Sequence, residues 1–358
     1  MERVTNWIFK IEPGDLLTLI NITLQNGYSY NGGALFNEGK LTIQNCQIQY
    51  NKAEQGGGIY SQGNISNLTI DCSIMNNNQA NYEGIGIYNS QGKIIINNFI
   101  FNNNNAYYAG AGIENDGYYN EFFVNKCTFI DNYAQYGGTG IGNRYGLLTI
   151  IKSIFKNNKT DYSGGVVGSY GDNLTVINST FTNNTSESDA GALGNMGDNF
   201  KVINSTFNNN SVFNYGGASG SSGDNFTLIN STFNNNNVGG DYYGGGVVGN
   251  EGNNFTVINS LFNNNIADNF TGGASGNSEH YFTVINSIFI NNRAIQKGAI
   301  GNIGENLTVI NSKFMNNSAE EYDAAIGAAS DNVTIINSTF INNNAPQVEQ
   351  YTLLLEKI

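Results

Sequence analysis

Apolar and polar residues follow a short pattern that recurs about every 26 residues along most of this chain. Two apolar residues with one polar residue between them precede an Asn, and a further apolar residue, here called the anchor, is closely followed by Asn-Asn. Clear copies are LTVINSTFTNN (174–184), FKVINSTFNNN (200–210), FTLINSTFNNN (226–236) and VTIINSTFINN (333–343). Alternation with a period of two is typical of a β-strand that buries one face. The pattern therefore predicts short strands rather than helices.

Thirteen copies of the pattern cover nearly the whole chain, and their spacing predicts the fold. The anchors are Leu24, Ile48, Ile74, Phe101, Phe129, Phe155, Phe181, Phe207, Phe233, Phe262, Phe289, Phe314 and Phe340. A regular period of this length indicates a solenoid, in which each repeat forms one circuit, here called a coil, that packs on its neighbours. We expect an all-β, single-stranded, right-handed parallel β-helix of about 13 coils with three short strands in each coil.

The boundaries of the repeat suggest three regions. Residues 1–16 are expected to form a partial first coil or an N-terminal cap, residues 17–345 the β-helix, and residues 346–358 a C-terminal cap or tail that buries Leu353–Leu355. A leucine-rich repeat is the competing fold because its period overlaps. However, the Asn falls one place too early for that motif, and the Gly- and Asn-rich half of each coil disfavours a helix.

Two positions in each coil are almost always Asn. Asn stands three residues before the anchor in ten of the thirteen coils and three residues after it in twelve. We expect these side chains to stack inward at the strand spacing of about 4.8 Å, with amides hydrogen-bonded along the stack. Glycosylation sequons that use an inward Asn, such as Asn178-Ser-Thr, are then inaccessible, whereas Asn173, Asn225 and Asn332 lie at outer corners.

The motifs also resemble those of known families. FxxN elements (Phe181–Asn184, Phe207–Asn210, Phe314–Asn317) occur together with GGA elements, such as Gly216-Gly217-Ala218. In this combination the chain resembles the repeats of chlamydial polymorphic outer-membrane proteins, and its Asn- and Thr-rich coils resemble adhesin-like surface proteins of methanogenic archaea. The resemblance covers about residues 17–345 and implies a pectin-lyase-like β-helix at the cell surface. We do not expect the autotransporter secretion route of the chlamydial group.

Composition narrows the possible partners. The net charge of −13 and the pI near 4.4 argue against binding to nucleic-acid phosphates. No window of about 18 apolar residues is present that would span a membrane. The first residues lack the basic and then apolar form of a signal peptide, so we expect this chain to be a segment of a longer extracellular or cell-surface protein.

Aromatic and acidic residues gather just before the Gly-Gly corner of most coils, and this is the expected binding surface. Exposed aromatic rings beside carboxylates suit a glycan or a protein partner. The alternative is that each Tyr merely seals the end of the core. The candidate binding residues are Tyr108, Tyr136, Tyr162, Tyr215, Asp241, Tyr242, Tyr243, Phe270 and Tyr322.

Two further columns of residues are candidates for binding. Asp172, Asp198 and Asp224 stand nine residues before successive anchors, where stacked carboxylates would recruit Ca²⁺ or else only satisfy a turn. The outward position four residues before the anchor is Ile in eight consecutive coils, and such a ridge suits lateral packing or simply favours the strand. The ridge consists of Ile151, Ile177, Ile203, Ile229, Ile258, Ile285, Ile310 and Ile336.

The three cysteines are expected to have a structural rather than a catalytic role. Cys46, Cys72 and Cys127 are each assigned to the position two residues before an anchor, where other coils have Ser, which implies small inward side chains. Cys46 and Cys72 are in adjacent coils and could reach disulfide distance, although free buried thiols are the favoured interpretation.

These observations favour a surface module over an enzyme. We expect an adhesin-like segment that binds glycans or partner surface proteins through the Tyr/Asp-rich loops, with no cofactor apart from the Ca²⁺ candidate. A structural spacer rod of a larger cell-envelope protein is the first alternative. A polysaccharide lyase or hydrolase is the second, but no coil is expected to gather acids and bases in one place, as such catalysis requires.

Overall fold

The computed structural model describes residues 7–107, 110–118, 120–162, 165–187, 190–213, 217–239, 246–268, 272–329 and 332–347. This described part contains strands, turns and bends but no helix. The chain divides into two compact units, unit 1 (residues 1–187) and unit 2 (residues 188–358). Together they hold about 12 coils with a period of about 26 residues. The predicted all-β, parallel solenoid is confirmed.

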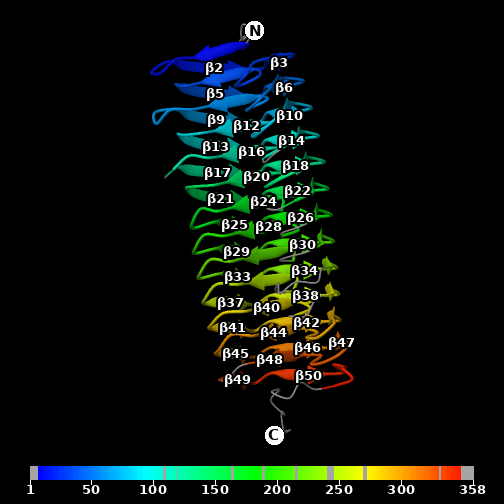
Figure 1. The fold of residues 1–358 in the computed structure, drawn as a ribbon. Helices are drawn as coiled ribbons and strands as arrows, with labels where there is room; N and C mark the ends of the chain where they lie inside the picture. Colours follow the sequence, from blue (N-terminus) through cyan, green and yellow to red (C-terminus); the bar gives the residue numbers. More distant parts are fainter. Residues whose placement is uncertain are drawn as a thin grey trace. The chain divides into compact units, whose positions relative to one another are not determined.

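Unit 1 consists of parallel strands in four sheets, and each complete coil runs through sheets C, D, A and B in that order. Sheet C contains β2 (Leu16–Ile20), β5 (Lys40–Gln44), β9 (Asn67–Asp71), β13 (Lys93–Asn97), β17 (Glu121–Asn125), β21 (Leu147–Ile151) and β25 (Thr175–Ile177). Sheet D contains β3 (Thr23–Gln25), β6 (Gln47–Gln49), β10 (Ile74–Asn76), β14 (Ile100–Asn102), β18 (Thr128–Ile130), β22 (Ile154–Lys156) and β26 (Thr180–Thr182). In Figure 1, β5, β9, β13, β17 and β21 follow one another in a single column.

The other two sheets of unit 1 complete each coil. Sheet A contains β7 (Lys52–Ala53), β11 (Gln79–Ala80), β15 (Asn105–Ala106), β19 (Tyr133–Ala134), β23 (Lys159–Thr160) and β27 (Thr185–Ser186). Sheet B contains β1 (Phe9–Ile11), β4 (Leu35–Asn37), β8 (Ile59–Ser61), β12 (Ile87–Asn89), β16 (Ile113–Asn115), β20 (Ile141–Asn143) and β24 (Val167–Ser169). Three strands per coil were expected. The short strand in sheet A is a fourth, which the sequence pattern did not reveal because only two residues pair there.

Unit 2 repeats the same four-sheet arrangement. Sheet C contains β29 (Lys201–Ile203), β33 (Thr227–Ile229), β37 (Phe255–Ile258), β41 (Phe282–Ile285), β45 (Leu307–Ile310) and β49 (Val333–Ile336). Sheet D contains β30 (Thr206–Asn208), β34 (Thr232–Asn234), β38 (Leu261–Asn263), β42 (Ile288–Ile290), β46 (Lys313–Met315) and β50 (Thr339–Ile341). Sheet A contains β31 (Ser211–Val212), β35 (Asn237–Gly239), β39 (Ile266–Asp268), β43 (Arg293–Ala294) and β47 (Ser318–Ala319). Sheet B contains β28 (Leu193–Asn195), β32 (Ser219–Ser221), β36 (Val248–Asn250), β40 (Ser275–Asn277), β44 (Ile300–Asn302) and β48 (Ile326–Ala328).

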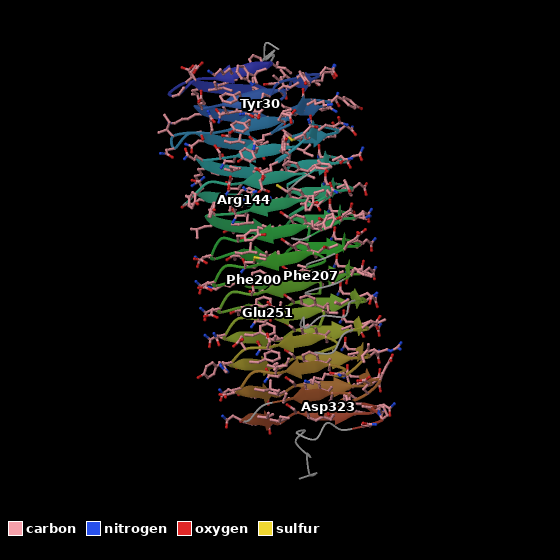
Figure 2. All side chains as sticks on the ribbon, viewed as in Figure 1. Tyr30, Arg144, Phe200, Phe207, Glu251 and Asp323 are labelled. Carbon is pink, nitrogen blue, oxygen red and sulfur yellow. The ribbon has the colours of Figure 1, made fainter. Side chains whose placement is uncertain are left out.

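The core of each unit is a set of stacked identical side chains. In unit 1, Phe101, Phe129 and Phe155 are buried, and neighbouring ring centroids lie 4.7 Å apart with nearly parallel planes. In unit 2, Phe200 and Phe207 (labelled in Figure 2) begin two such stacks, at 4.4 Å from Phe226 and 4.5 Å from Phe233. Burying a Phe side chain contributes about 1.5–3 kcal/mol relative to leaving it exposed, so the anchors supply much of the stability of each coil.

One anchor was assigned to the wrong residue. Ile74 is 39% exposed, whereas Met75 is fully buried and pairs with Ile48 and Phe101 in sheet D. The run Asn76–Asn78 leaves the position of Asn-Asn after the anchor ambiguous in the sequence. The shift by one residue also moves Cys72 out of the predicted inward position, and Cys72 is exposed while Cys46 and Cys127 are buried.

The Asn three residues after the anchor forms the predicted ladder. Asn132, for example, donates from Nδ2 to the carbonyl oxygen of Phe101 (3.1 Å) and to Oδ1 of Asn158 (3.0 Å), and its backbone N–H donates to the same Oδ1 (3.1 Å). Asn132 Oδ1 accepts the equivalent two bonds from Asn104. Each ladder amide therefore satisfies buried backbone groups at the bend between sheets D and A.

The Asn three residues before the anchor has a different role from the one predicted. Asn178 is exposed and has a φ of 53°, in the left-handed region that Asn tolerates better than most residues. Ser179 takes the inward place and accepts a hydrogen bond from the backbone N–H of Ser153 (3.1 Å). The prediction that the Asn178 sequon is inaccessible is therefore wrong, because Asn is required there for its backbone conformation and not for an inward side chain.

The ladder predicts which Asn substitutions destabilise the fold. Replacing Asn132 by Ala removes the Oδ1 that accepts from the Asn104 backbone N–H and from its amide, together with the Nδ2 that donates to Phe101 and Asn158, so two buried Asn104 donors lose their acceptor. Each unpaired buried group costs about 1–3 kcal/mol, so we expect a loss of about 3 kcal/mol or more in the free energy of unfolding. The measurement is the urea midpoint of the full chain, followed by circular dichroism.

Asn157→Gly is the matched control for this substitution. Asn157 has a φ of 55°, and its side chain makes only exposed hydrogen bonds, donated to Asp131 and accepted from Asn183. Gly adopts this backbone conformation without strain. We expect a change within about 0.5 kcal/mol. Equal shifts for the two variants would show that the buried ladder has no special role.

The corrected register also predicts thiol reactivity. Burial raises the pKa of Cys127 to about 12, and desolvation followed by the hydrogen bond to Asp71 raises the pKa of the exposed Cys72 less strongly. At mildly alkaline pH the folded protein should therefore react with a maleimide at Cys72 first, with all three thiols reacting after denaturation. Peptide mass spectrometry identifies the labelled residue, and simultaneous labelling of Cys46 and Cys72 would contradict the register.

Candidate functional site

The predicted aromatic surface lies on the loops that lead from sheet A to sheet B. Tyr136 and Tyr162 follow β19 and β23 in adjacent coils of unit 1, and Tyr322 follows β47 in unit 2. The remaining predicted residues, Tyr108, Tyr215, Asp241, Tyr242, Tyr243 and Phe270, lie outside the described residues. Of the predicted residues that the structure describes, Tyr136 and Tyr162 lie together in unit 1, and Tyr322 lies on a loop of unit 2.

Unit 1 presents a column of exposed tyrosines on these loops. Tyr82, Tyr107, Tyr136 and Tyr162 come from four consecutive coils, and all are exposed. Tyr136 (37% exposed) and Tyr162 (47% exposed) stack with ring centroids 4.6 Å apart and an angle of 11° between their planes. Stacking covers one face of each ring, so this pair offers less open ring surface to a partner than two separate tyrosines would.

Charged residues beside the stacked pair are held in place by hydrogen bonds. The Tyr133 hydroxyl donates to Asp161, and Lys159 Nζ lies 3.1 Å from an Asp161 oxygen and 3.3 Å from a Glu187 oxygen. The hydrogen bond from Tyr133 and the nearby Lys159 lower the pKa of Asp161, and the bond to Asp161 raises the pKa of Tyr133 to about 12. The Asp161 carboxylate is therefore ionised at neutral pH and is held by these contacts.

A second charged cluster fixes the loop that carries Tyr82. Arg144, which follows β20 and is labelled in Figure 2, lies 2.5 Å from Glu83 (Nη2 to Oε1), 3.4 Å from Asp116 (Nη1 to Oδ2) and 4.0 Å from Glu114 (Nε to Oε1). Glu83 is the residue after Tyr82. Through this ion pair, Arg144 ties the tyrosine loop to the end of sheet B.

This cluster was not predicted, because the expectation that no coil gathers acids and bases considered single coils. Its members come from three coils, and only the parallel register places Tyr88 beside Glu114 and Glu114 beside Gly142. A signal was nevertheless present in the sequence. The outward position of sheet B is aromatic in the earlier coils (Phe36, Tyr60, Tyr88) and Gly in the later ones (Gly142, Gly168), with Glu114 as the exception between them.

Glu114 is buried against the end of the aromatic stack. Its side chain is 3% exposed, and its Oε2 has no hydrogen-bond partner among the residues that the structure describes. A Cβ on Gly142 would lie 1.9 Å from that oxygen, so any side chain at position 142 would require the Glu114 carboxyl group to move. Burial, together with the negative charge of Glu83, raises the pKa of Glu114 to about 8 in spite of the nearby Arg144. The carboxyl group is therefore largely protonated at neutral pH.

The Glu114 cluster differs from a glycosidase site in its accessibility. A glycosidase also pairs a protonated with an ionised carboxyl group, but its two groups flank a bound sugar. Glu114 is covered. The neighbouring carboxylate, Asp116, accepts a hydrogen bond from the Tyr88 hydroxyl at its Oδ2 (3.1 Å). In this arrangement the cluster can hold loops in place, and it offers no room for a substrate at Glu114.

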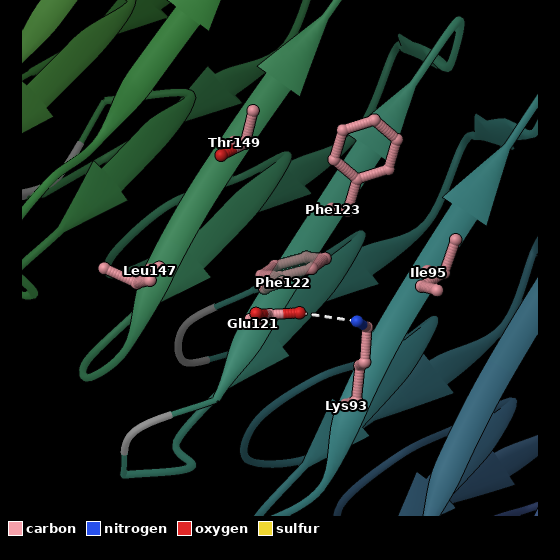
Figure 3. Close-up of a pocket in the computed structure, with 7 residues that line it drawn as sticks. All are labelled: Lys93, Ile95, Glu121, Phe122, Phe123, Leu147 and Thr149. Atoms are coloured by element: carbon pink, nitrogen blue, oxygen red, sulfur yellow. Dashed lines mark hydrogen bonds and ion pairs between the residues drawn. The ribbon is translucent and has the colours of Figure 1, made fainter.

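A hollow on the outer face of sheet C is a second feature that was not predicted. It has a volume of about 270 Å³ and is lined by Lys93, Ile95, Glu121, Phe122, Phe123, Leu147 and Thr149. Figure 3 shows Phe123 beside Ile95 and Thr149 on neighbouring strands, with Lys93 Nζ 2.5 Å from Glu121 Oε2 at one edge. The signal in the sequence was apolar Ile95 and Phe123 at an outward position that is usually Thr. The floor suits an apolar side chain of a partner.

The acidic column satisfies backbone groups of neighbouring coils. In unit 2, Asp198 Oδ1 accepts the backbone N–H of Asp224 (2.8 Å), and Asp224 Oδ1 accepts that of Asn253 (2.7 Å). Within the described ranges, no group of three or more His, Cys, Asp or Glu side chains is arranged to hold a metal ion. The Ca²⁺ site at Asp172, Asp198 and Asp224 stays a prediction, and the observed hydrogen bonds agree with a turn-forming role.

The isoleucine ridge faces outward as predicted. In unit 1, Ile151 pairs with Ile177 in sheet C, and both are half-buried. In unit 2 the column comprises Ile203, Ile229, Ile258, Ile285, Ile310 and Ile336. Lateral packing through this ridge stays a prediction.

Comparisons with known proteins do not extend the structural result. No protein-family model matches the chain, and no curated protein matches its sequence. No helix in the part that the structure describes has the length and apolar character needed to cross a membrane. The fold places the chain in the class of parallel β-solenoids with asparagine ladders, and these comparisons assign it to no family.

The buried Glu114 predicts how stability depends on pH. Its pKa rises from 4.5 to about 8 on folding, so folding binds a proton. The contribution to stability is complete below about pH 4.5 and is lost as the pH rises through about 8. One pKa unit corresponds to about 1.4 kcal/mol, and we expect a loss of a few kcal/mol across this window, measured as the urea midpoint of the full chain.

Glu114→Gln tests this assignment because Gln keeps the shape of the side chain but cannot ionise. The variant should have a flatter dependence of the urea midpoint on pH across the same window. An unchanged slope would mean that another group is responsible.

Proposed function

We propose that unit 1 is a non-catalytic, adhesin-like binding module that binds a partner surface protein through its tyrosine loop face. This face is defined by Tyr82, Tyr107, Tyr136 and Tyr162 together with the acidic residues Glu83, Asp161 and Glu187. The observation that carries the proposal is the exposure of tyrosines on four consecutive coils next to carboxylates with fixed positions.

The geometry of the rings favours a protein over a sugar at this face. A sugar stacks on the open face of a ring, whereas Tyr136 and Tyr162 each have one face covered by the other ring. Ring edges and hydroxyl groups suit protein interfaces, where Tyr is enriched and contributes contact area at a low entropic cost. The net charge of −13 and the carboxylates of the face suit a partner with a basic patch.

Preorganisation supports the same function. The Arg144–Glu83 ion pair holds the Tyr82 loop, and the Lys159–Asp161 pair with Tyr133 holds the corner beside Tyr162. Binding then needs little further ordering of the loops, which is a main cost of association. The likeness of the repeats to adhesin-like surface proteins supports the same proposal, with an extracellular or cell-surface location as part of a longer chain.

The alternatives have less support. The uniform Phe stacks of unit 2 also suit a spacer rod that binds nothing. A polysaccharide-degrading activity would need accessible carboxylates, and Glu114, the protonated member of the Arg144 cluster, is buried.

The test is a double substitution, Tyr136→Ala with Tyr162→Ala, in the full chain. Surface plasmon resonance measures binding to a panel of purified matrix proteins and mucin glycoproteins, each with and without enzymatic deglycosylation. We expect binding to at least one panel member that survives deglycosylation, and a dissociation constant raised roughly tenfold or more in the variant, since buried Tyr side chains are frequent hot spots.

Tyr170→Ala is the matched control, because Tyr170 is exposed in unit 1 but lies after β24, away from the loop face. Loss of binding on deglycosylation would show that the partner is a glycan and not a protein surface. Binding to no panel member would favour the spacer rod.

A further inference from the structure

A hollow at the corner between sheets D and A of unit 1 has a lining unlike the rest of the surface. Its volume is about 330 Å³, at the lower end of the range for small-molecule sites. It is lined by Tyr50, Asn77, Asn78, Gln79, Asn103 and Asn105. Every lining residue except Tyr50 carries a carboxamide, so the hollow has one aromatic ring, several amides and no charge.

Tyr50 departs from the repeat at a place where the backbone favours Asn. The residue two places after the anchor has a positive φ in successive coils, with values of 60° at Asn26, 53° at Tyr50, 53° at Asn77 and 53° at Asn103. Asn tolerates this conformation, whereas a bulky side chain there is an outlier. The backbone therefore does not explain Tyr50, and strained residues of this kind gather at binding sites.

The ring of Tyr50 is open, in contrast to the stacked pair on the tyrosine loop face. Its neighbours in the column, Asn26 and Asn77, have no rings, and the side chain of Tyr50 is 56% exposed. Among the residues that the structure describes, none stacks a ring on Tyr50. A flat apolar surface is thus available to a ligand next to polar groups.

The amides offer both kinds of hydrogen-bonding atom. Asn103 Nδ2 donates to Asn77 Oδ1 (2.7 Å), and Asn78 donates to the Ile48 carbonyl oxygen as part of the buried ladder. These bonds fix the floor of the hollow. Gln79 and Asn105 are exposed at its edge. An amide has two donor hydrogens and an acceptor oxygen, which matches a hydroxyl group that both donates and accepts.

We infer that this hollow binds an uncharged sugar, whose C–H face packs on the Tyr50 ring and whose hydroxyl groups bind the amides of Gln79, Asn103 and Asn105. The lining residues carry no charge at neutral pH, so the hollow offers no ion pair to a uronic acid or an amino sugar. The site shares no residue with the tyrosine loop face, although Asn105 is two residues before Tyr107, and the inference does not depend on the function of that face.

The test is Tyr50→Asn, which restores the residue of the neighbouring coils. Because Asn is compatible with the local backbone, the variant should fold and its Tm should stay the same or rise. The probes are the methyl glycosides of glucose, galactose and mannose and their di- and trisaccharides, with galacturonic acid and glucosamine as charged controls. Saturation-transfer NMR on the full chain detects binding, and titration calorimetry gives the dissociation constant.

We expect at least one neutral glycoside to bind and Tyr50→Asn to weaken it roughly tenfold or more. Tyr281→Asn is the matched control. Tyr281 is also 56% exposed and also has a positive φ (65°) between Asn positions, but it lies in unit 2 and does not line this hollow. This substitution relieves the same backbone strain and should leave sugar binding unchanged.

The inference is overturned if no neutral glycoside gives a signal with the wild-type chain, or if Tyr50→Asn binds as tightly as Tyr281→Asn. Tyr136→Ala with Tyr162→Ala should leave glycoside binding intact, so failure of the protein-binding proposal and failure of the sugar site are distinguishable.

Discussion

The bend between sheets D and A depends on one repeated interaction, the hydrogen bonding of a buried Asn amide across neighbouring coils. Each Oδ1, such as that of Asn158, accepts two bonds from the preceding coil, and each Nδ2 donates to the anchor carbonyl oxygen of that coil, as Asn158 does to Phe129. Buried backbone groups that lie outside a sheet must be paired in some way. Since the same solution is used in coil after coil, the position of the ladder fixes the register of every other inward residue, including the Phe stacks.

This dependence explains how much of the fold could be predicted from the sequence. The inward Phe and Asn repeat at fixed spacings, so the solenoid and its core could be predicted without a structure. The face of a given Asn could not, because Asn is favoured both for its amide, as at Asn184, and for its left-handed backbone, as at Asn178. The same residue type therefore serves two different structural roles, which the sequence alone does not distinguish.

The candidate sites were harder to predict because they are made between coils. Glu83, Glu114 and Arg144 are separated by about one coil each, and nothing local in the sequence marks them as neighbours. Their contact follows from the register alone. The tyrosines before the corner could be predicted, because the repeat leaves that segment free of core residues, yet the face-to-face packing of Tyr136 and Tyr162 depends on the spacing between coils.

The ladder also has an evolutionary consequence. Phe207 and Phe233 are 26 residues apart and their coils are equivalent, so a deletion or duplication of one such coil would leave Phe opposite Phe and ladder Asn opposite ladder Asn. Unequal recombination can therefore change the length of a regular stretch without creating a cavity or an unpaired amide. The Arg144 cluster takes its members from three different coils, and losing any one of them breaks it. Sites built between coils thus restrict where the solenoid can grow or shrink.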